Sequence, residues 1–333
     1  MRSIVQVTVH ASQFPGNVQQ TLRASLRTGR INHKFLYDGV RHAQKWLALH
    51  EAYSPARTVP DCVATYEKAF AAAARNTPKE RVHVVGLGCG GGQKDAQLLA
   101  LLKRAGRKLS YTPCDVSLAM VLAACQTASE VLDLEDCFPL VCDLAEADDL
   151  TAVLEHQCPP DAGGLVTFFG MLPNFEPQVI LPRLAGLVRA GDRLLLDANL
   201  APGPDYAFGV QSILPQYDNE LTRDWLMTFL LDIGVERSDG DLQFAVQDDM
   251  PEHGLKRVVA EFHFKDTRRI EVQSEMFEFL RGESLRLFFS YRHTPDRVGQ
   301  LLARHGLAVV DQWVTRAEDE GVFLCQRKPL APR

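Results

Sequence analysis

The sequence predicts an α/β protein with a parallel sheet that is interrupted by an inserted α+β segment. Three observations support this fold class. Between Val82 and Asn199, short apolar runs alternate with amphipathic stretches, which is typical of repeated strand–helix units. A glycine-dense turn follows the first apolar run. After Asn199 the alternation gives way to a helical stretch and to runs with the period-two pattern of strands.

The first part of the pattern predicts strands and helices in strict alternation. The strands are expected near 82–86, 109–115, 138–142, 164–170 and 192–199, and the helices near 93–105, 117–128, 147–156 and 178–189. Repeated units of this kind form a parallel sheet that is covered on both faces. We therefore expect a ligand crevice at the carboxyl ends of the strands.

The second part begins at a linker over residues 201–204. A helical stretch from Glu220 to Ile233 follows, and then come period-two runs near 241–248, 254–264, 268–276 and 284–291. A helix near 295–304 and the runs Leu307–Val314 and Gly321–Arg327 are expected to close the sheet as an antiparallel hairpin. The predicted domains are 65–199 plus 291–333 for a cofactor, and 1–64 plus 200–290 as a substrate-binding domain or lid.

The glycine-dense turn runs from Gly86 to Gly92. Each glycine costs conformational entropy on folding, so this density indicates a backbone that must approach a ligand closely. A second apolar run ends at Asp115, where a carboxylate can accept hydrogen bonds from two ribose hydroxyls. Together the two features predict a cofactor that contains a nucleoside.

Two cofactor classes fit this turn. The spacing Gly86-x-Gly88-x-x-Gly91 satisfies the dinucleotide fingerprint, whereas Gly88-x-Gly90 followed by an acidic residue after the second strand fits S-adenosyl-L-methionine. Dinucleotide domains generally continue in parallel. The predicted antiparallel closing hairpin therefore favours S-adenosyl-L-methionine.

Composition excludes several other classes. The net charge of −6 argues against a nucleic-acid surface, and the basic residues occur only in small groups. No apolar stretch is long enough to cross a bilayer, and the first twenty residues lack a charged-then-apolar leader, so a cytoplasmic protein without a membrane partner is expected. The sequence has neither a Cys-x-x-Cys pair nor a His-x-x-x-His pair with an attendant glutamate, and we expect no metal site.

Four further segments concentrate aromatic and amide side chains: Phe35–Gly39, Glu51–Arg57, Phe169–Pro177 and Gln216–Asn219. With these segments the sequence resembles the histidine-specific Nα-methyltransferases of ergothioneine biosynthesis and their relatives, including fungal dimethylallyltryptophan N-methyltransferases. The resemblance covers nearly the whole chain in the same order, and it rests on Tyr37, Tyr53–Arg57, the glycine turn with Lys94, Asp115-Val116, Asp143, Gly170–Asn174 and Tyr217-Asp218. It implies a Rossmann-like class I methyltransferase fold, with a seven-stranded sheet and an inserted α+β substrate-binding domain.

The resemblance also implies roles for individual residues. The methyl donor would be held by Gly88, Gly90, Lys94, Asp115, Asp143, Leu144 and Gly170. In that arrangement Asp115 meets the ribose, Asp143 lies near the adenine amino group and Lys94 meets the donor carboxylate. Asn174 and Tyr217 would bind the carboxylate and amino group of an α-amino acid. Tyr37 would act with them as a catalytic residue, and Tyr53 would lie nearby at the substrate.

Three positions depart from the family pattern. Gly86 stands where the family has an acidic residue two positions before the leading glycine of the turn. Phe288 stands where a glutamate would grip an imidazole, although Ser290, on the same strand face, is kept. Ala260 stands where a methionine would line the pocket. The change at Phe288 removes an acceptor for a ring N–H, which costs a buried imidazole about 1–3 kcal/mol.

These departures favour an apolar or aromatic amino acid over histidine as the small-molecule substrate, with methylation at the α-amino group. Three alternatives remain open at this stage. The protein could be a methyltransferase of another small metabolite, an NAD(P)-dependent oxidoreductase, or a catalytically silent partner with a methyltransferase shape. The sequence defines neither the oligomeric state nor the number of methyl groups added.

Overall fold

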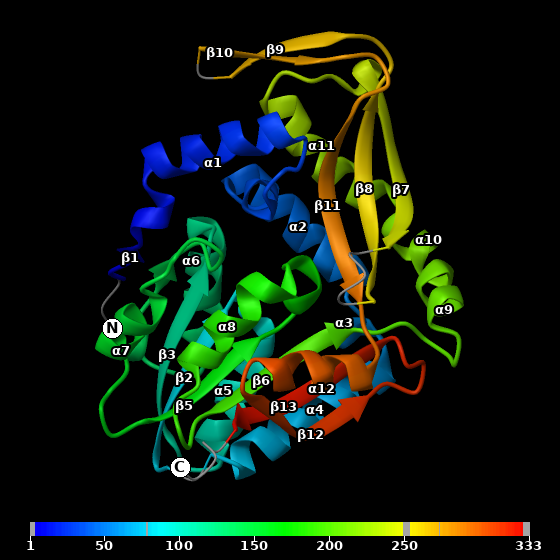
Figure 1. Ribbon diagram of the computed structural model, residues 1–333. Coiled ribbons are helices and arrows are strands. Elements are labelled where there is room, and N and C mark those ends of the chain that lie inside the picture. The colour runs from blue at the N-terminus through cyan, green and yellow to red at the C-terminus, as the bar shows by residue number, and fades with distance from the viewer. Residues whose placement is uncertain (1–3, 78, 249–253, 273, 329–333) are drawn as a thin grey trace. The chain divides into compact units, whose positions relative to one another are not determined.

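The computed structural model describes residues 4–77, 79–248, 254–272 and 274–328 and contains two compact units (Figure 1). The sheet unit takes the described residues of 1–13, 55–200 and 293–333. The insert unit takes those of 14–54 and 201–292. None of the described helices is both long enough and apolar enough to cross a membrane.

The sheet unit contains an eight-stranded sheet with the order β1-β4-β3-β2-β5-β6-β13-β12. Neighbouring strands are parallel from β1 to β6, whereas β13 is antiparallel to both β6 and β12. The strands are β1 (Thr8–Val9), β2 (Arg81–Leu87), β3 (Lys108–Asp115), β4 (Leu140–Val141), β5 (Gly163–Phe168), β6 (Arg193–Asn199), β12 (Leu307–Val314) and β13 (Glu320–Arg327). The predicted α/β fold with an antiparallel closing hairpin is confirmed, and the strand beyond the expected seven is the two-residue β1.

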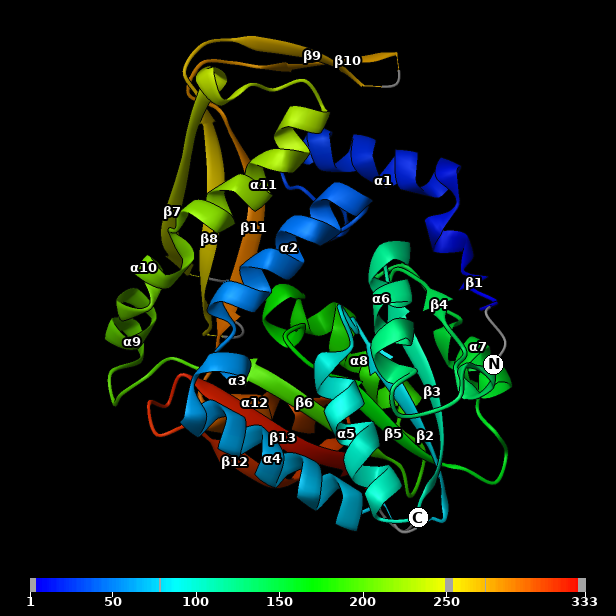
Figure 2. The same ribbon diagram turned by 180° about the vertical axis from the view of Figure 1, so that it is seen from behind.

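Helices cover both faces of this sheet (Figures 1 and 2). One face carries α4 (Pro60–Arg75), α5 (Gln93–Arg104) and α6 (Leu118–Ala128), and the other carries α7 (Leu150–Gln157), α8 (Pro177–Leu187) and α12 (Pro295–Arg304). Short helical turns complete the unit: η1 (Ala11–Gln13), α3 (Pro55–Thr58), η3 (Leu134–Asp136) and η4 (Leu172–Asn174). Leu98, Leu99 and Leu102 of α5 are fully buried, as the helical spacing of its apolar residues requires.

The insert unit is α+β, as the sequence predicts. Its three-stranded antiparallel sheet has the order β11-β8-β7, and α2 and α11 lie side by side against it (Figure 2). The strands are β7 (Gly240–Asp248), β8 (Lys256–Phe264) and β11 (Ser284–Arg292). The helices are α1 (Pro15–Thr28), η2 (His33–Leu36), α2 (Val40–Tyr53), α9 (Tyr206–Ser212), α10 (Leu214–Tyr217), α11 (Glu220–Asp232) and η5 (Arg237–Asp239).

One strand prediction is wrong. The run near 268–276 is not a single strand but the hairpin of β9 (Arg268–Val272) and β10 (Glu275–Phe279), in which Val272 pairs with Glu275. The chain reverses with Ser274 at φ 64, a conformation that a non-glycine side chain rarely adopts. Because the turn has no Asn-Gly or Gly-Gly signature, the alternating apolar pattern runs through it without a break.

The connections at both ends of the 201–292 excursion lie together on the sheet unit. Leu200 forms a parallel bridge with His293, and the His293 backbone N–H donates to the Asn199 carbonyl at 3.0 Å. The excursion therefore starts and ends at adjacent points of the sheet unit.

Candidate active site

The turn between β2 and α5 needs its glycines for two physical reasons. Gly88, Gly90 and Gly92 have φ values of 63, 51 and 75, in the left-handed region that favours glycine. Space is also restricted, because a Cβ on Gly88 would lie 2.6 Å from Met171 and one on Gly92 would lie 2.8 Å from the Cα of Ala124. The turn therefore presents bare backbone, as the sequence predicts for a ligand cradle.

Asp115 ends β3 directly beside this turn. One carboxylate oxygen accepts the Gly90 N–H at 3.1 Å and the other accepts the Ser117 N–H at 3.0 Å. Burial raises the pKa of Asp115 to about 6, although these backbone hydrogen bonds oppose the rise. A carboxylate oxygen has two lone pairs, so each oxygen can accept one more hydrogen bond, such as that of a ribose hydroxyl.

The next two strand ends carry the other predicted donor residues. Asp143 follows β4, is buried, and accepts the Ala145 N–H at 2.9 Å, while its own N–H donates to Ser12 Oγ at 3.0 Å. Leu144 beside it is buried. Gly170 follows β5 with φ 72, and its carbonyl accepts the Asn174 side-chain amide at 3.1 Å. The structure thus gathers the predicted donor residues at the carboxyl edge of β2 to β5, and bare amides beside carboxylates fit a nucleoside with an amino-acid tail.

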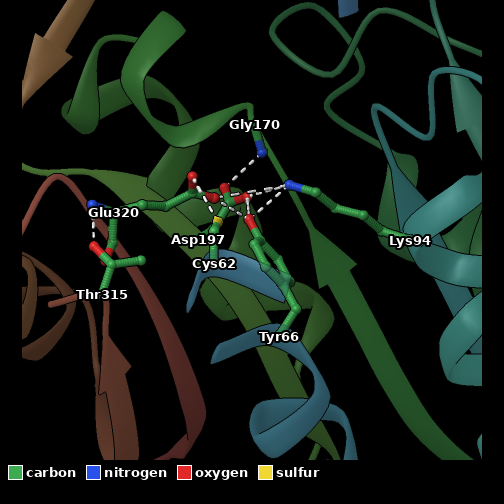
Figure 3. A network of polar contacts seen from close by, with 7 residues as sticks. All are labelled: Cys62, Tyr66, Lys94, Gly170, Asp197, Thr315 and Glu320. Atoms are coloured by element: carbon green, nitrogen blue, oxygen red, sulfur yellow. Dashed lines mark hydrogen bonds and ion pairs between the residues drawn. The ribbon is translucent and has the colours of Figure 1, made fainter. Parts of the chain in front are cut away.

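Lys94, in the first turn of α5, belongs to a buried polar network (Figure 3). Its ammonium donates to Asp197 Oδ2 at 2.8 Å and to the Tyr66 hydroxyl at 2.6 Å, and it lies 4.0 Å from Glu320 Oε1. Asp197 also accepts the Gly170 N–H at 2.5 Å. Burial lowers the pKa of Lys94, but the neighbouring acids, Asp197 foremost, raise it more, so the ammonium is held in its charged form.

The Tyr66 hydroxyl lies within hydrogen-bond distance of the carboxylates of both Asp197 and Glu320 (Figure 3). A phenol has a single proton to donate, so it cannot satisfy both acids. Burial raises the pKa of Glu320. We therefore assign a proton to Glu320 and the negative charge to Asp197, which is the acid that pairs with Lys94.

Sequence reasoning identified Lys94 but missed Tyr66, Asp197 and Glu320. They come from α4, β6 and β13, which lie far apart in the sequence. One signal was available, because Asp197 is a single acidic residue within the apolar run from Leu194 to Ala198. Charged residues are rarely fully buried without a partner.

In the insert unit, three side chains form a chain of hydrogen bonds. The Arg292 guanidinium donates to the Tyr217 hydroxyl at 2.7 Å, and that hydroxyl donates to Ser290 Oγ at 2.9 Å. The guanidinium carbon also lies 5.3 Å from the centre of the Tyr217 ring. Sequence reasoning named Tyr217 and Ser290 but missed Arg292, two residues after Ser290 on the same strand.

Phe288 lies at the centre of an aromatic group. Its ring centre is 6.0 Å from those of Tyr217 and Trp225 and 5.4 Å from that of His33, against which it stacks. Ala260 is its direct partner across the β8–β11 pair. Burial, helped by the charge of Arg286, lowers the pKa of His33 to about 3, so this imidazole is neutral at physiological pH.

The two remaining predicted tyrosines lie in different surroundings. The half-buried Tyr37 has its ring centre 5.5 Å from that of Trp225, which joins it to the aromatic group around Phe288. Tyr53, the last residue of α2, is 54% exposed, and the ring contacts described for the insert unit do not include it. Sequence reasoning missed Trp225 and His33, whose spacing gave no sign that they meet Phe288.

The model of a family described as histidine-specific methyltransferase, SAM-dependent, matches residues 14–327. The chain belongs to this family. It is therefore a methyltransferase that uses S-adenosylmethionine, and the oxidoreductase alternative is wrong. A search of curated proteins finds no match.

The solved structures that match this chain are distant in sequence. Magnesium protoporphyrin IX methyltransferase from Synechocystis PCC 6803 has a TM-score of 0.44 and 15% identity, over 88% of this chain and 97% of that one. The CcbJ methyltransferase from Streptomyces caelestis has a TM-score of 0.41 and 10% identity, over 80% and 90% of the two chains. A 1,6-didemethyltoxoflavin-N1-methyltransferase from Burkholderia thailandensis has a TM-score of 0.41 and 12% identity, over 86% and 88%.

Proposed function

We propose that this methyltransferase transfers a methyl group to the α-amino group of an amino acid, or of a close derivative, whose side chain is apolar or aromatic. The observation that carries the proposal is Phe288. The resemblance to the family implies a carboxylate at this position, and the neighbours of the Phe288 ring are the rings of Tyr217, Trp225 and His33. These aromatic rings offer no carboxylate that could accept a hydrogen bond from the ring N–H of an imidazole substrate.

The donor-binding roles are part of the proposal. Backbone amides of Gly88 and Gly90 cradle the donor with Leu144 and Gly170 beside it, Asp115 accepts the ribose hydroxyls, and Asp143 meets the adenine amino group. Lys94 supplies a cation for the donor carboxylate. When bound, S-adenosylmethionine supplies an electrophilic methyl group on a positively charged sulfur.

For the acceptor, we assign binding of the amino and carboxylate groups to Tyr217 and Asn174. The Tyr217 hydroxyl has a fixed direction because it accepts from Arg292 and donates to Ser290. Tyr37 is assigned to orient the amine, and Tyr53 to contact the rest of the acceptor. Holding two reactants in line contributes several kcal/mol to catalysis.

The amine must be neutral when it reacts. The α-amino group of a chain terminus titrates at about 8 and that of a free amino acid somewhat higher, so a minor fraction is unprotonated at neutral pH and no strong base is required. The tyrosine hydroxyls then orient the nitrogen lone pair rather than remove a tightly held proton. We assign no general base.

The direct test is a screen of the twenty amino acids and common biogenic amines with a labelled methyl donor. We expect the best acceptors to be tryptophan, tyrosine, phenylalanine or apolar amino acids, with histidine poor. Phe288→Glu should then raise kcat/KM for histidine by about 10- to 100-fold, since a restored acceptor contributes about 1–3 kcal/mol. Phe288→Leu, which adds no acceptor, is the matched control.

Two results would contradict the proposal. Histidine as the best acceptor of the unchanged protein would show that Phe288 does not set specificity. A complete lack of transfer across the panel, with binding of S-adenosylhomocysteine intact, would instead indicate another small metabolite as the acceptor.

A further inference from the structure

Gly86 lies near the end of the buried strand β2, where the resemblance to the family implies an acidic residue. The backbone there is ordinary extended strand, so no positive φ requires a glycine. Space does. A Cβ on Gly86 would lie 2.1 Å from Asp95 Oδ2 and 2.9 Å from the Tyr111 hydroxyl. A carboxylate from another element already fills the place of a side chain at this position.

Asp95 lies in the first turn of α5, and only 3% of its surface is exposed. Its two oxygens accept from two buried hydroxyls, Tyr111 of β3 at 2.7 Å and Thr167 of β5 at 2.7 Å. Burial raises the pKa of Asp95, whereas these hydrogen bonds and the charge of Lys94 oppose the rise. The carboxylate therefore connects α5 to the strands on both sides of β2, directly above Gly86.

This position is structurally important because β2 and α5 are the two ends of the glycine turn. Gly86 lies two residues before Gly88, and Asp95 lies three residues after Gly92. A group that fixes Asp95 against β3 and β5 therefore also fixes where the turn begins and ends. The same volume cannot hold a second carboxylate.

We infer that Asp95, from helix α5, supplies the buried carboxylate that fills the space over Gly86, and that it is a positioning residue for the glycine turn that binds the methyl donor. The inference depends on the use of S-adenosylmethionine and on the geometry around Gly86. It does not depend on which acceptor is methylated.

The test relocates the carboxylate. Asp95→Ala removes it and leaves two buried hydroxyls without their acceptor, so the Kd for S-adenosylhomocysteine should rise on the order of tenfold. Gly86→Asp alone places two carboxylates in one volume and should lower both the melting temperature and the affinity. In the double variant, Gly86→Asp with Asp95→Ala, the new side chain no longer meets the Asp95 carboxylate, so it should be more stable than either single variant and bind more tightly than Asp95→Ala. Because its Cβ still lies 2.9 Å from the Tyr111 hydroxyl, recovery should be partial. Calorimetry and thermal unfolding measure both quantities.

A matched control is Asp192→Ala. Asp192 is also buried, and it accepts the Gly164 N–H at 2.8 Å and pairs with Arg189 at 2.7 Å, before the start of β6. Its loss should lower the melting temperature but leave the Kd for S-adenosylhomocysteine unchanged. The control thus separates a general loss of stability from a loss of donor binding.

The double variant decides the inference even if a single variant fails to fold. A double variant that is more stable than both single variants and binds more tightly than Asp95→Ala supports it. A double variant that is no more stable than the worse single variant, or binds no more tightly than Asp95→Ala, overturns it. Failure of the amino-acid screen with this recovery intact would refute only the proposed acceptor.

Discussion

Replacing Asp197 by asparagine tests the assignment of charge in the Lys94 network. The amide oxygen can still accept the Gly170 N–H, but the amide nitrogen then faces the Lys94 ammonium across a distance that is now 2.8 Å. The side chain of Asp197 is only 5% exposed and that of Lys94 20%, so water screens little of the repulsion. Removing one partner of a buried ion pair costs about 3–5 kcal/mol.

Two neighbours reduce this cost. Lys94 keeps its hydrogen bond to Tyr66, and Glu320, at 4.0 Å, can release its proton and replace part of the lost charge. We therefore expect a loss of about 2 kcal/mol, which corresponds to a fall of about 4–8 °C in melting temperature for a unit of this size. Thermal unfolding followed by circular dichroism, without donor, measures the fall.

The matched control lies in the same network. Glu320→Gln imitates the protonated acid, so we expect a loss below about 1 kcal/mol at neutral pH. An exposed pair, Arg81 with Asp161 at 3.1 Å, provides a second comparison, because Asp161→Asn should cost less than about 1 kcal/mol. A larger loss for Glu320→Gln than for Asp197→Asn would refute the assignment of the negative charge to Asp197.

The remaining predictions concern ligand binding. Lys94→Met should weaken S-adenosylhomocysteine by about 10- to 100-fold but leave 5′-methylthioadenosine, which has no carboxylate, nearly unchanged. With the pKa of Asp115 at about 6, the affinity for S-adenosylhomocysteine should fall as pH drops below that value, by up to about tenfold per pH unit, and Asp115→Asn should remove this dependence. Arg292→Gln should raise the acceptor KM several-fold by releasing the Tyr217 hydroxyl, without changing the Kd of the donor.

The sign of the Asp115 prediction follows from its raised pKa. An acid whose pKa is higher in the folded chain than its ordinary value of 3.8 stabilises the fold at low pH, and that stabilisation is lost as pH rises to about 6. Ribose hydroxyls need the ionised carboxylate as acceptor, so binding has the opposite dependence and strengthens over the same interval. Equal weakening of both ligands by Lys94→Met, a flat pH profile, or an altered donor Kd in Arg292→Gln would contradict the respective prediction.

The sequence predicted the regular elements well where one physical pattern governed them. The strands around the glycine turn and helices α5 and α6 lie within two residues of their predicted positions, because buried parallel strands and amphipathic helices have distinct periods. The pattern did not reveal β1, since two residues are too few for a period, nor helix α4, which precedes the strand–helix alternation in the chain.

The candidate site was predictable only where a motif lies within one stretch of chain. Gly88, Gly90 and Asp115 were identified from local spacing, and the structure places them together. Asp95 and Asp197 were not, because each acquires its role from residues on other elements: the first from the space above Gly86, the second from Lys94 and Tyr66. Such roles depend on tertiary packing, which local spacing does not encode.

The bridge between Leu200 and His293 means that the chain leaves and re-enters the sheet unit at neighbouring residues. Because the two ends of the 201–292 excursion are adjacent, a segment of different length can replace it without moving either attachment point. Because α2 of segment 14–54 packs beside α11 in the same unit, that segment has to be exchanged together with the excursion. Exchange of the two segments together leaves the strand order of the sheet unit unchanged.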